Sequence, residues 1–199
     1  MPVPLAEMTY EKFLEWDEAP EHSEWVDGKV ELMDGVTLPD HEVHIFLLMM
    51  VAQFVESRKL GKVFMRPFQM KIGPDLPGRA PDVFFVKKMD LSRLRTLYFD
   101  GPADLVIEVI SPDSRALDRD KKFYEYEEGG VPEFWLIDPE RNEAEFFLLG
   151  ADKMYHAAPL GEDGIYRSKV LDGLWLKVGW LWEDPMPDII KVLKELGVY

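Results

Sequence analysis

The chain has 199 residues, 47% of them hydrophobic and 13% aromatic, so it is long and apolar enough to bury a core and is not a disordered protein. The absence of cysteine excludes disulfide scaffolds, thiolate metal sites and cysteine catalysis. No apolar stretch approaches the roughly 18 residues that span a bilayer. Residues 1–18 carry one lysine among several acids, unlike a signal peptide. We expect a soluble, cytoplasmic protein.

The formal net charge of -15 argues against a nucleic-acid partner, but the charge is unevenly distributed. Residues 1–57 have a net charge of -11 and residues 123–199 of -9, whereas residues 58–122 have a net charge of +5. Charge alone favours an ordinary uneven surface. If the protein binds a polyanion, the central segment is where we expect it to do so.

The first predicted elements are a short helix, a hairpin and a long helix. Thr9 can cap a helix that runs to Leu14, and residues 24–33 are strand-like with a turn signal at Asp27-Gly28. Residues 40–58 have helical periodicity, and apolar residues cover this helix nearly all round. We expect it to be central and buried.

Strands dominate the middle of the chain. Residues 62–72 are predicted to form a strand, and a Gly- and Pro-rich loop follows over residues 73–81. Residues 82–86 and 103–110 are short and almost entirely apolar, which is typical of strands buried on both faces.

The rest of the chain is predicted to continue with a helix over residues 117–128, closed by Gly129-Gly130. We then expect strands at 133–138 and 143–149, a β-rich stretch over 150–182 and a closing helix over 187–197. This order indicates one α/β domain over residues 1–199, with a mixed sheet flanked by helices and β-hairpin extensions. Its core would span about residues 24–149, with a β-rich C-terminal portion at 150–199.

Glu108 is the most informative residue, because it interrupts an apolar strand. A buried carboxylate is costly unless it is paired with a cation or bound to a metal. A structural ion pair with Arg79 or Lys122 explains it as well as a functional role does.

Asp82 and Lys122 are the other two candidates. Asp82 follows Pro81 at the start of an apolar strand, and alone it is most simply a turn residue. Lys122 lies on the helix after the Glu108 strand, and alone it is most simply a surface ion-pair residue. Together, two carboxylates at adjacent strand ends can hold Mg²⁺ or Mn²⁺, and a nearby lysine can orient water and balance phosphate charge.

Four ordered motifs carry a resemblance to a known family. They are Pro81-Asp82, the run Gly101 to Pro112 around Glu108, the pattern Asp118-x-x-x-Lys122-x-x-x-Tyr126, and the run Gly130 to Pro139. In combination they resemble the Uma-type restriction endonucleases of the PD-(D/E)xK nuclease superfamily. Residues 24–30 and the helix preceded by His41 also look like this family, so the resemblance covers most of the chain.

The resemblance implies a restriction-endonuclease-like fold and assigns roles to several residues. Asp82 and Glu108 match the family's metal-binding acids, with the backbone carbonyl of Val109 as a further ligand. The superfamily's lysine would fall at Ile110, but Lys122 matches a position to which it has migrated, with Lys121 as the alternative in a shifted register. Glu24 looks like an extra metal-site acid, and a surface glutamate explains it equally well.

Other candidates have plainer explanations. His41 and His44 lie three residues apart, but no third ligand has matching spacing, so we expect capping or core packing, although His41 matches a family position near the site. Trp175, Trp180 and Trp182 form a dense apolar cluster that favours packing in the core or at a dimer interface over base stacking.

The function predicted from the sequence is a divalent-metal-dependent endonuclease, an Mg²⁺- or Mn²⁺-dependent hydrolase that cuts phosphodiester bonds in DNA and could act as a homodimer. Asp82, Glu108 and Lys122 would be its catalytic residues. One alternative is a non-cleaving nucleic-acid-binding or assembly module that retains the fold. The other is a metal-dependent hydrolase of a different phosphorylated substrate.

Overall fold

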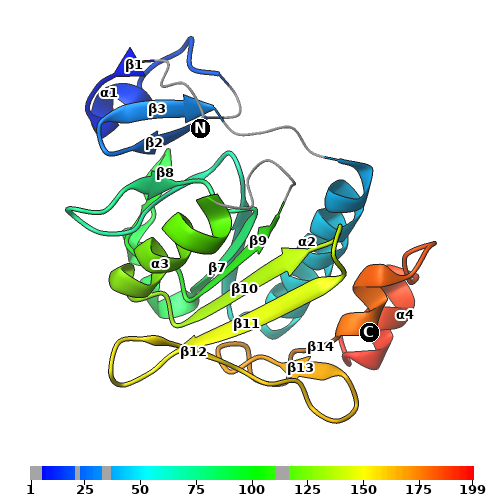
Figure 1. Ribbon diagram of the computed structural model, residues 1–199. Coiled ribbons are helices and arrows are strands. Elements are labelled where there is room, and N and C mark those ends of the chain that lie inside the picture. Colours follow the sequence, from blue (N-terminus) through cyan, green and yellow to red (C-terminus); the bar gives the residue numbers. More distant parts are fainter. Residues whose placement is uncertain (1–5, 21–22, 33–36, 111–116) are drawn as a thin grey trace.

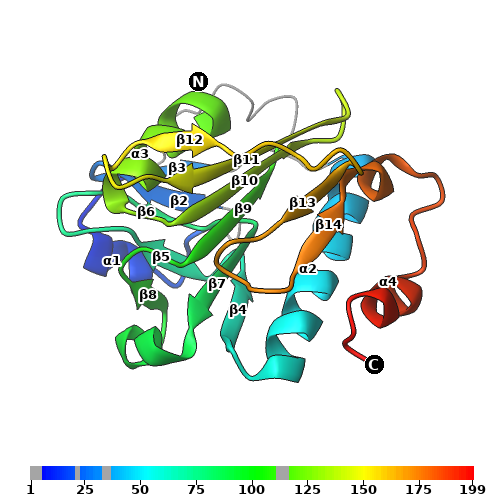
Figure 2. The same cartoon turned by 90° about the horizontal axis from the view of Figure 1, so that it is seen from below.

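The structure is a computed structural model that describes residues 6–20, 23–32, 37–110 and 117–199. Its centre is a mixed six-stranded sheet, the core sheet. The strands are β4 (Gly61–Met65), β7 (Val83–Lys87), β9 (Leu105–Val109), β10 (Glu133–Asp138), β11 (Glu143–Leu149) and β12 (Tyr155–Ala157). They lie in the order β12-β11-β10-β9-β7-β4, and only the β9–β10 pair is parallel. Figure 2 shows these strands from below.

A second mixed sheet lies beside the core sheet and contains the N-terminal hairpin. Its strands are β1 (Ala6–Glu7), β2 (Ser23–Val26), β3 (Lys29–Leu32), β5 (Gln69–Lys71), β6 (Gly78–Arg79) and β8 (Tyr98–Asp100), in the order β1-β3-β2-β6-β5-β8. The predicted β2–β3 turn is present. Asp27 and Gly28 both have positive φ, as a tight two-residue hairpin turn requires.

Four α-helices accompany the sheets in the described residues: α1 (Tyr10–Leu14), α2 (Leu38–Arg58), α3 (Phe123–Gly129) and α4 (Ile189–Glu195). The long helix α2 begins with a reciprocal cap, in which Thr37 and Asp40 each accept the other's backbone N–H. It ends at Arg58 and is capped by Lys59, which has a left-handed conformation. Helix α3 continues a π-helical turn, Leu117–Lys122.

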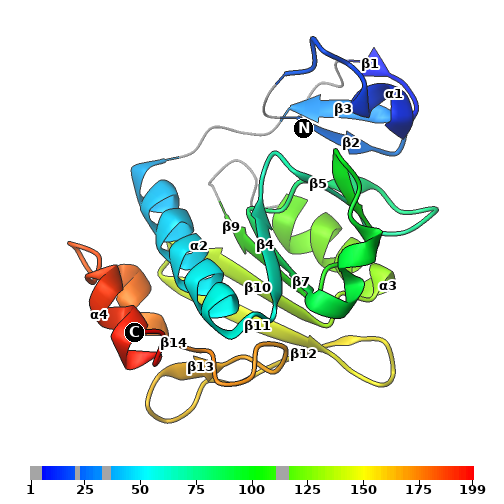
Figure 3. The ribbon, with the colours of Figure 1, turned by 180° about the vertical axis from the view of Figure 1, so that it is seen from behind.

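The two faces of the core sheet are covered by different helices (Figures 1 and 3). Alternate residues of a strand point to opposite faces. Val83, Phe85 and Ile107 pack with α2, whereas Phe84 and Val106 pack on the side of α3. Buried residues of the C-terminal portion join the α2 side: Tyr166, Leu171, Leu174, Leu176, Trp180, Leu181, Val192 and Leu196.

This C-terminal portion contains the hairpin of β13 (Ile165–Arg167) and β14 (Trp175–Lys177), followed by a 3₁₀ turn, Val178–Trp182, and then α4. Trp180 is buried, and Trp175 and Trp182 pack against the core at partial burial. Core packing, one of the two roles expected for these tryptophans, is what the structure shows. The predicted closing helix is present but shorter.

The predicted strand over residues 62–72 is wrong in one respect. The chain leaves the core sheet after Met65 and enters the second sheet at Gln69, so two strands replace one. Pro67 lies at the break, and proline cannot donate a hydrogen bond to a neighbouring strand. The predicted loop over 73–81 contains β6. Strand β8 and the 3₁₀ turn Lys88–Arg93 were not predicted.

Candidate functional site

Three charged residues lie in a row across the β4, β7 and β9 strands, at the β4 side of the core sheet. The β7–β9 register pairs Val83 with Ile107, so its continuation by one residue sets Asp82 opposite Glu108. The β4–β7 register pairs Met65 with Val83, which likewise sets Arg66 opposite Asp82. Directly opposed residues of antiparallel strands point to the same face. The row is therefore cationic at one end and has two neighbouring carboxylates.

Asp82 is held on two sides. Its Oδ2 accepts a hydrogen bond of 2.7 Å from the backbone N–H of Val109, and its Oδ1 lies 3.0 Å from a guanidinium nitrogen of Arg66. Burial raises the pKa of the Asp82 carboxyl above its ordinary value of 3.8, although Arg66 and Lys122 act in the opposite direction. The carboxylate is therefore fixed in place, and burial makes its ionised form unfavourable in free energy.

Histidine 44 fastens the same aspartate from the other face of the sheet. His44 is buried on α2, and its Nε2 lies 3.0 Å from the backbone carbonyl oxygen of Asp82. Burial lowers the pKa of His44, which favours the neutral ring, and a carbonyl only accepts, so Nε2 carries the hydrogen. His41, which matched the family position, is exposed.

Glu108 is contacted by a lysine and a tyrosine from the helical segment that ends in α3. Lys122 Nζ lies 3.3 Å from Glu108 Oε2, and the Tyr126 hydroxyl donates to Glu108 Oε1 at 2.6 Å. Burial and the nearby Glu108 charge keep the pKa of Tyr126 well above 10.0, so this hydroxyl stays protonated. Lys121 lies elsewhere: its side chain is 40% exposed and its Nζ is 3.9 Å from Asp27. The structure therefore brings Lys122 to the carboxylates and leaves Lys121 outside.

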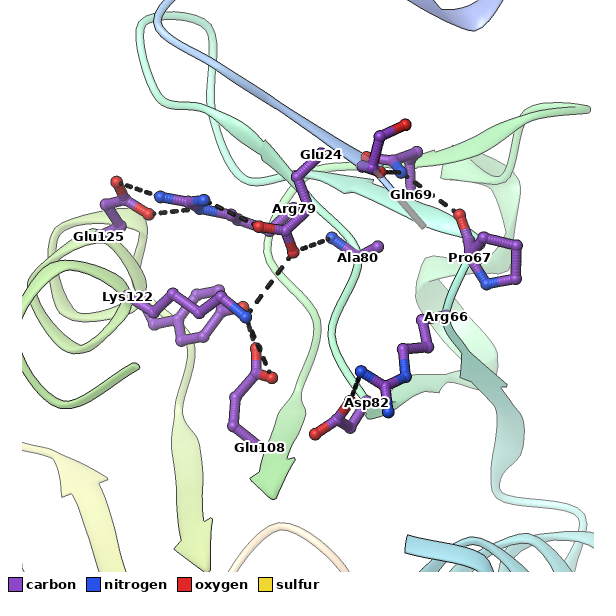
Figure 4. A network of polar contacts seen from close by, with 12 residues as sticks. Glu24, Arg66, Pro67, Gln69, Arg79, Ala80, Asp82, Glu108, Lys122 and Glu125 are labelled. Carbon is purple, nitrogen blue, oxygen red and sulfur yellow. Dashed lines mark hydrogen bonds and ion pairs between the residues drawn. The ribbon is translucent and has the colours of Figure 1, made fainter. Parts of the chain in front are cut away.

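The Lys122 ammonium lies between Glu108 and Glu24 (Figure 4), and Glu24 is buried as Lys122 is. Its Oε1 is 3.7 Å from Lys122 Nζ and accepts the Ala80 N–H at 3.0 Å, while its Oε2 is 2.8 Å from Arg79. Burial acts to raise the pKa of Glu24, but Lys122 and Arg79 outweigh it and lower this pKa below 4.5. The surface interpretation of Glu24 is wrong, because pairing in the hairpin turns its side chain inward.

Arg79 closes the far side of the cluster. Its guanidinium is fully buried and makes a two-pronged contact with Glu125, at 2.7 and 2.9 Å, in addition to the Glu24 contact. Among the described side chains, the cluster has four carboxylates against three cationic groups. The carboxylates are Glu24, Asp82, Glu108 and Glu125, and the cations are Arg66, Arg79 and Lys122.

The donor atoms at the Asp82–Glu108 pair fit a hard divalent cation. Both side chains offer carboxylate oxygens, and the carboxylates of the cluster outnumber its cations. Mg²⁺ is commonly bound by one or two carboxylates and completes its shell with waters and phosphate oxygens. In the described part of the chain, no group of three or more acids and histidines is arranged to bind a metal, so any site here rests on the pair.

Comparison with known proteins places the chain. A family model named Uma2, with the description "Putative restriction endonuclease", matches residues 10–179. The chain belongs to the Uma2 family. No curated protein sequence matches it. Among solved structures, it is similar to the crystal structure of a putative nuclease belonging to DUF820 from Anabaena variabilis ATCC 29413. The TM-score is 0.70 at 18% identity, over 91% of this chain and 98% of that one.

The resemblance to the Uma2 family and the restriction-endonuclease-like fold predicted from the sequence are therefore confirmed. Parts of the motifs lie outside the described residues: Ser111, Pro112 and the side chain of Asp118. No described helix is long and apolar enough to cross a membrane. Arg66, Glu125 and the contact of His44 with Asp82 were not predicted. The one available signal for Arg66 was its position before Pro67, where a strand is expected to end.

Proposed function

We propose that this protein is an endonuclease that hydrolyses phosphodiester bonds in DNA and requires Mg²⁺ or Mn²⁺. The carrying observation is the arrangement of Asp82 and Glu108 opposite one another with Lys122 Nζ 3.3 Å from Glu108. Membership of the Uma2 family, whose description is "Putative restriction endonuclease", supports the reaction class and the substrate. We also propose that the protein acts in the cytoplasm.

Asp82 and Glu108, with the backbone carbonyl of Val109, would hold the cation. When bound, such an ion supplies Lewis-acid stabilisation of the phosphate and lowers the pKa of a coordinated water. Glu24 lies 3.7 Å from Lys122 and also binds Arg79 and the Ala80 N–H, so we assign it to positioning Lys122.

The protein's own groups supply the remaining parts of the mechanism. The Lys122 ammonium can orient the attacking water and offset the negative charge that develops on the phosphate oxygens. Tyr126 and the Val109 N–H hold Glu108 and Asp82 in place without titrating. Such pre-formed contacts reduce the reorganisation that the reaction would otherwise need.

Cleavage of supercoiled plasmid tests this proposal. The wild type should nick and linearise the plasmid with Mg²⁺ or Mn²⁺ and leave it intact with a chelator. Asp82→Ala, Glu108→Gln and Lys122→Ala should each lower the rate by about a hundredfold or more, since each removes a group that acts on the transition state. Lys121→Ala, one residue away but directed at Asp27, is the matched control and should keep wild-type activity.

Circular dichroism shows whether each variant is folded. A folded wild type that binds duplex DNA but leaves it intact with either metal would contradict the proposal and favour the non-cleaving binding module. Equal loss of activity in Lys121→Ala and Lys122→Ala would contradict the assignment of Lys122.

A further inference from the structure

Arg66 is a charged residue of the site that lies outside the sequence motifs. It follows β4 directly, and its backbone N–H donates to the Pro81 carbonyl at 3.0 Å, which fixes the chain beside Asp82. Its guanidinium lies 3.0 Å from Asp82 Oδ1. Figure 4 shows this side chain approaching Asp82 from the side opposite Glu108 and Lys122.

The two oxygens of Asp82 differ in what binds them. Oδ2 accepts the Val109 N–H at 2.7 Å, a contact made by the backbone of β9 that persists as long as the sheet does. Oδ1 is bound by Arg66, a flexible side chain. Since Asp82 is the proposed metal ligand, the oxygen more available to a cation is the one that Arg66 now contacts. The guanidinium charge of Arg66, 3.0 Å from Oδ1, would repel a divalent cation bound to that oxygen.

The two arginines of the site differ in their freedom to move. Arg79 is fully buried, and Glu24 and Glu125 bind its guanidinium on several sides. The Arg66 side chain is 20% exposed, and the described residues give its guanidinium one partner, Asp82. Arg66 can therefore leave its carboxylate and reach solvent or a ligand, whereas Arg79 cannot.

We propose that Arg66 is an exchangeable counter-ion of Asp82. Before metal binds, it neutralises the buried carboxylate. When a divalent cation binds Asp82, Arg66 leaves and pairs with a phosphate of the substrate, for which its planar guanidinium is suited. This inference rests on the proposed metal-dependent function and adds a substrate-binding residue to it.

The first test is a calorimetric titration with Mn²⁺ alone, without DNA. Arg66→Gln removes the competing charge and keeps a side chain of similar length, so it should bind Mn²⁺ about tenfold more tightly than the wild type. Arg66→Lys keeps the charge and should bind like the wild type. Arg95→Gln is the control, because Arg95 pairs with an aspartate, Asp100, on the surface at 3.1 Å. It should change nothing.

The second test measures binding of a short DNA duplex, with Ca²⁺ as the oxygen-seeking cation and a gel to verify that the DNA stays intact. With Ca²⁺, Arg66→Gln and Arg66→Lys should both bind the duplex about tenfold more weakly, because neither can form the two-pronged phosphate contact. With a chelator, both should bind it like the wild type. If Arg66→Gln does not fold, Arg66→Lys alone still tests the proposal through this contrast.

The outcomes separate the two proposals. If Asp82→Ala abolishes Mn²⁺ binding but Arg66→Gln binds Mn²⁺ no more tightly than the wild type, the exchange is wrong while the metal site stands. If Arg66→Gln lowers only the thermal stability, Arg66 is a structural counter-ion and the inference is overturned. If the wild type does not bind Mn²⁺, or if Asp82→Ala binds it equally well, the proposed function fails. The exchange of Arg66 then fails with it.

Discussion

Lys121 and Lys122 show how far the sequence determines single residues of this site. Successive residues of a helical turn point in different directions, so only one of the two lysines can face the carboxylates. The motif spacing predicted Lys122, and the structure places its Nζ 3.3 Å from Glu108. Asp82 and Glu108 were predicted as partners from the motifs, and the strand register sets them opposite each other.

The contacts of Arg66 and the orientation of Glu24 could not be derived from the sequence pattern. The contact of Arg66 with Asp82 depends on the β4–β7 register, and no local pattern encodes which residues of two strands face each other. The inward direction of Glu24 depends on the hairpin packing against β6 and on the presence of Arg79. Both are tertiary effects that local residue patterns do not encode, and for Glu24 only the family resemblance offered a place in the site as one of two alternatives.

Glu24 yields a prediction about pH. Its pKa is lowered in the folded protein, so its ionised form contributes stability that is present above its ordinary pKa of 4.5 and is lost as the pH falls through the lowered value. At neutral pH, Glu24→Gln should cost about 3 kcal/mol, because Arg79 and Lys122 lose a buried partner. The free energy of unfolding should be measured by denaturant titration between neutral pH and pH 3 or so.

The difference between wild type and Glu24→Gln should shrink as the pH drops below 4.5, since Glu24 of the unfolded wild type binds a proton there, whereas the folded protein does so only at a lower pH. A difference that stays constant over this range would show that ionisation of Glu24 contributes nothing to stability. Glu162→Gln, at an exposed position, provides the control and should follow the wild type throughout.

Among the elements, the turn before α3 has a different helix type from the one predicted. Residues 117–128 were predicted as one α-helix, but the first six form a π-helical turn. Such turns are rare and often occur at functional sites. Lys122 ends the turn, and Tyr126 follows four residues later on the same helical face, so both reach Glu108. A residue pattern shows which face of a helix is apolar, but not whether each N–H bonds the carbonyl four or five residues before it. The π-helical geometry therefore could not be predicted.

Strand β10 provides a prediction at the same scale. The fully buried Glu133 accepts five hydrogen bonds: two from Trp135 Nε1 and the Tyr166 hydroxyl, and three from the Ser168 hydroxyl and the N–H groups of Lys169 and Val170. It therefore joins the C-terminal portion to the core sheet.

Glu133→Ala should destabilise the protein by about 3–5 kcal/mol, because buried donors lose their acceptor. Thermal or denaturant unfolding measures this loss, and Glu162→Ala should stay within about 0.5 kcal/mol of the wild type. If Glu133→Ala unfolds residues 150–199 in a separate early transition, the prediction of a single domain over residues 1–199 is wrong. A single cooperative transition supports it.

At the scale of the whole molecule, the basic residues of the central segment, 58–122, are spread over the fold. Arg66, Arg79 and Lys122 lie in the site, whereas Lys59, Lys62 and Lys88 line a separate groove. Along α2, the groove residue nearest to His44 is Ala52, which lies about 12 Å away, given the rise of a helix. The central segment, where we expect any polyanion to bind, therefore does not gather all its basic residues in one place, because charge along the chain does not determine position in the fold.

The net charge of -15 nevertheless leads to a prediction about DNA binding. An acidic protein can hold duplex DNA only through local cations or a metal, and each phosphate contact releases counter-ions. Affinity for a short duplex should therefore fall by more than about tenfold between about 50 and 200 mM salt. Fluorescence anisotropy with a labelled duplex measures this slope. An affinity independent of salt would argue against a nucleic-acid substrate.

The most direct test of the central claim is a crystal structure of the protein soaked with Mn²⁺, with data collected so that manganese gives an anomalous signal. We predict one manganese peak between the carboxylates of Asp82 and Glu108, about 2.0–2.3 Å from an oxygen of each. Arg66 should be displaced from Asp82 Oδ1, and Lys122 should remain at Glu108. A fully soaked crystal with no peak at this pair, and with both ion pairs intact, would contradict the metal site and the nuclease mechanism built on it.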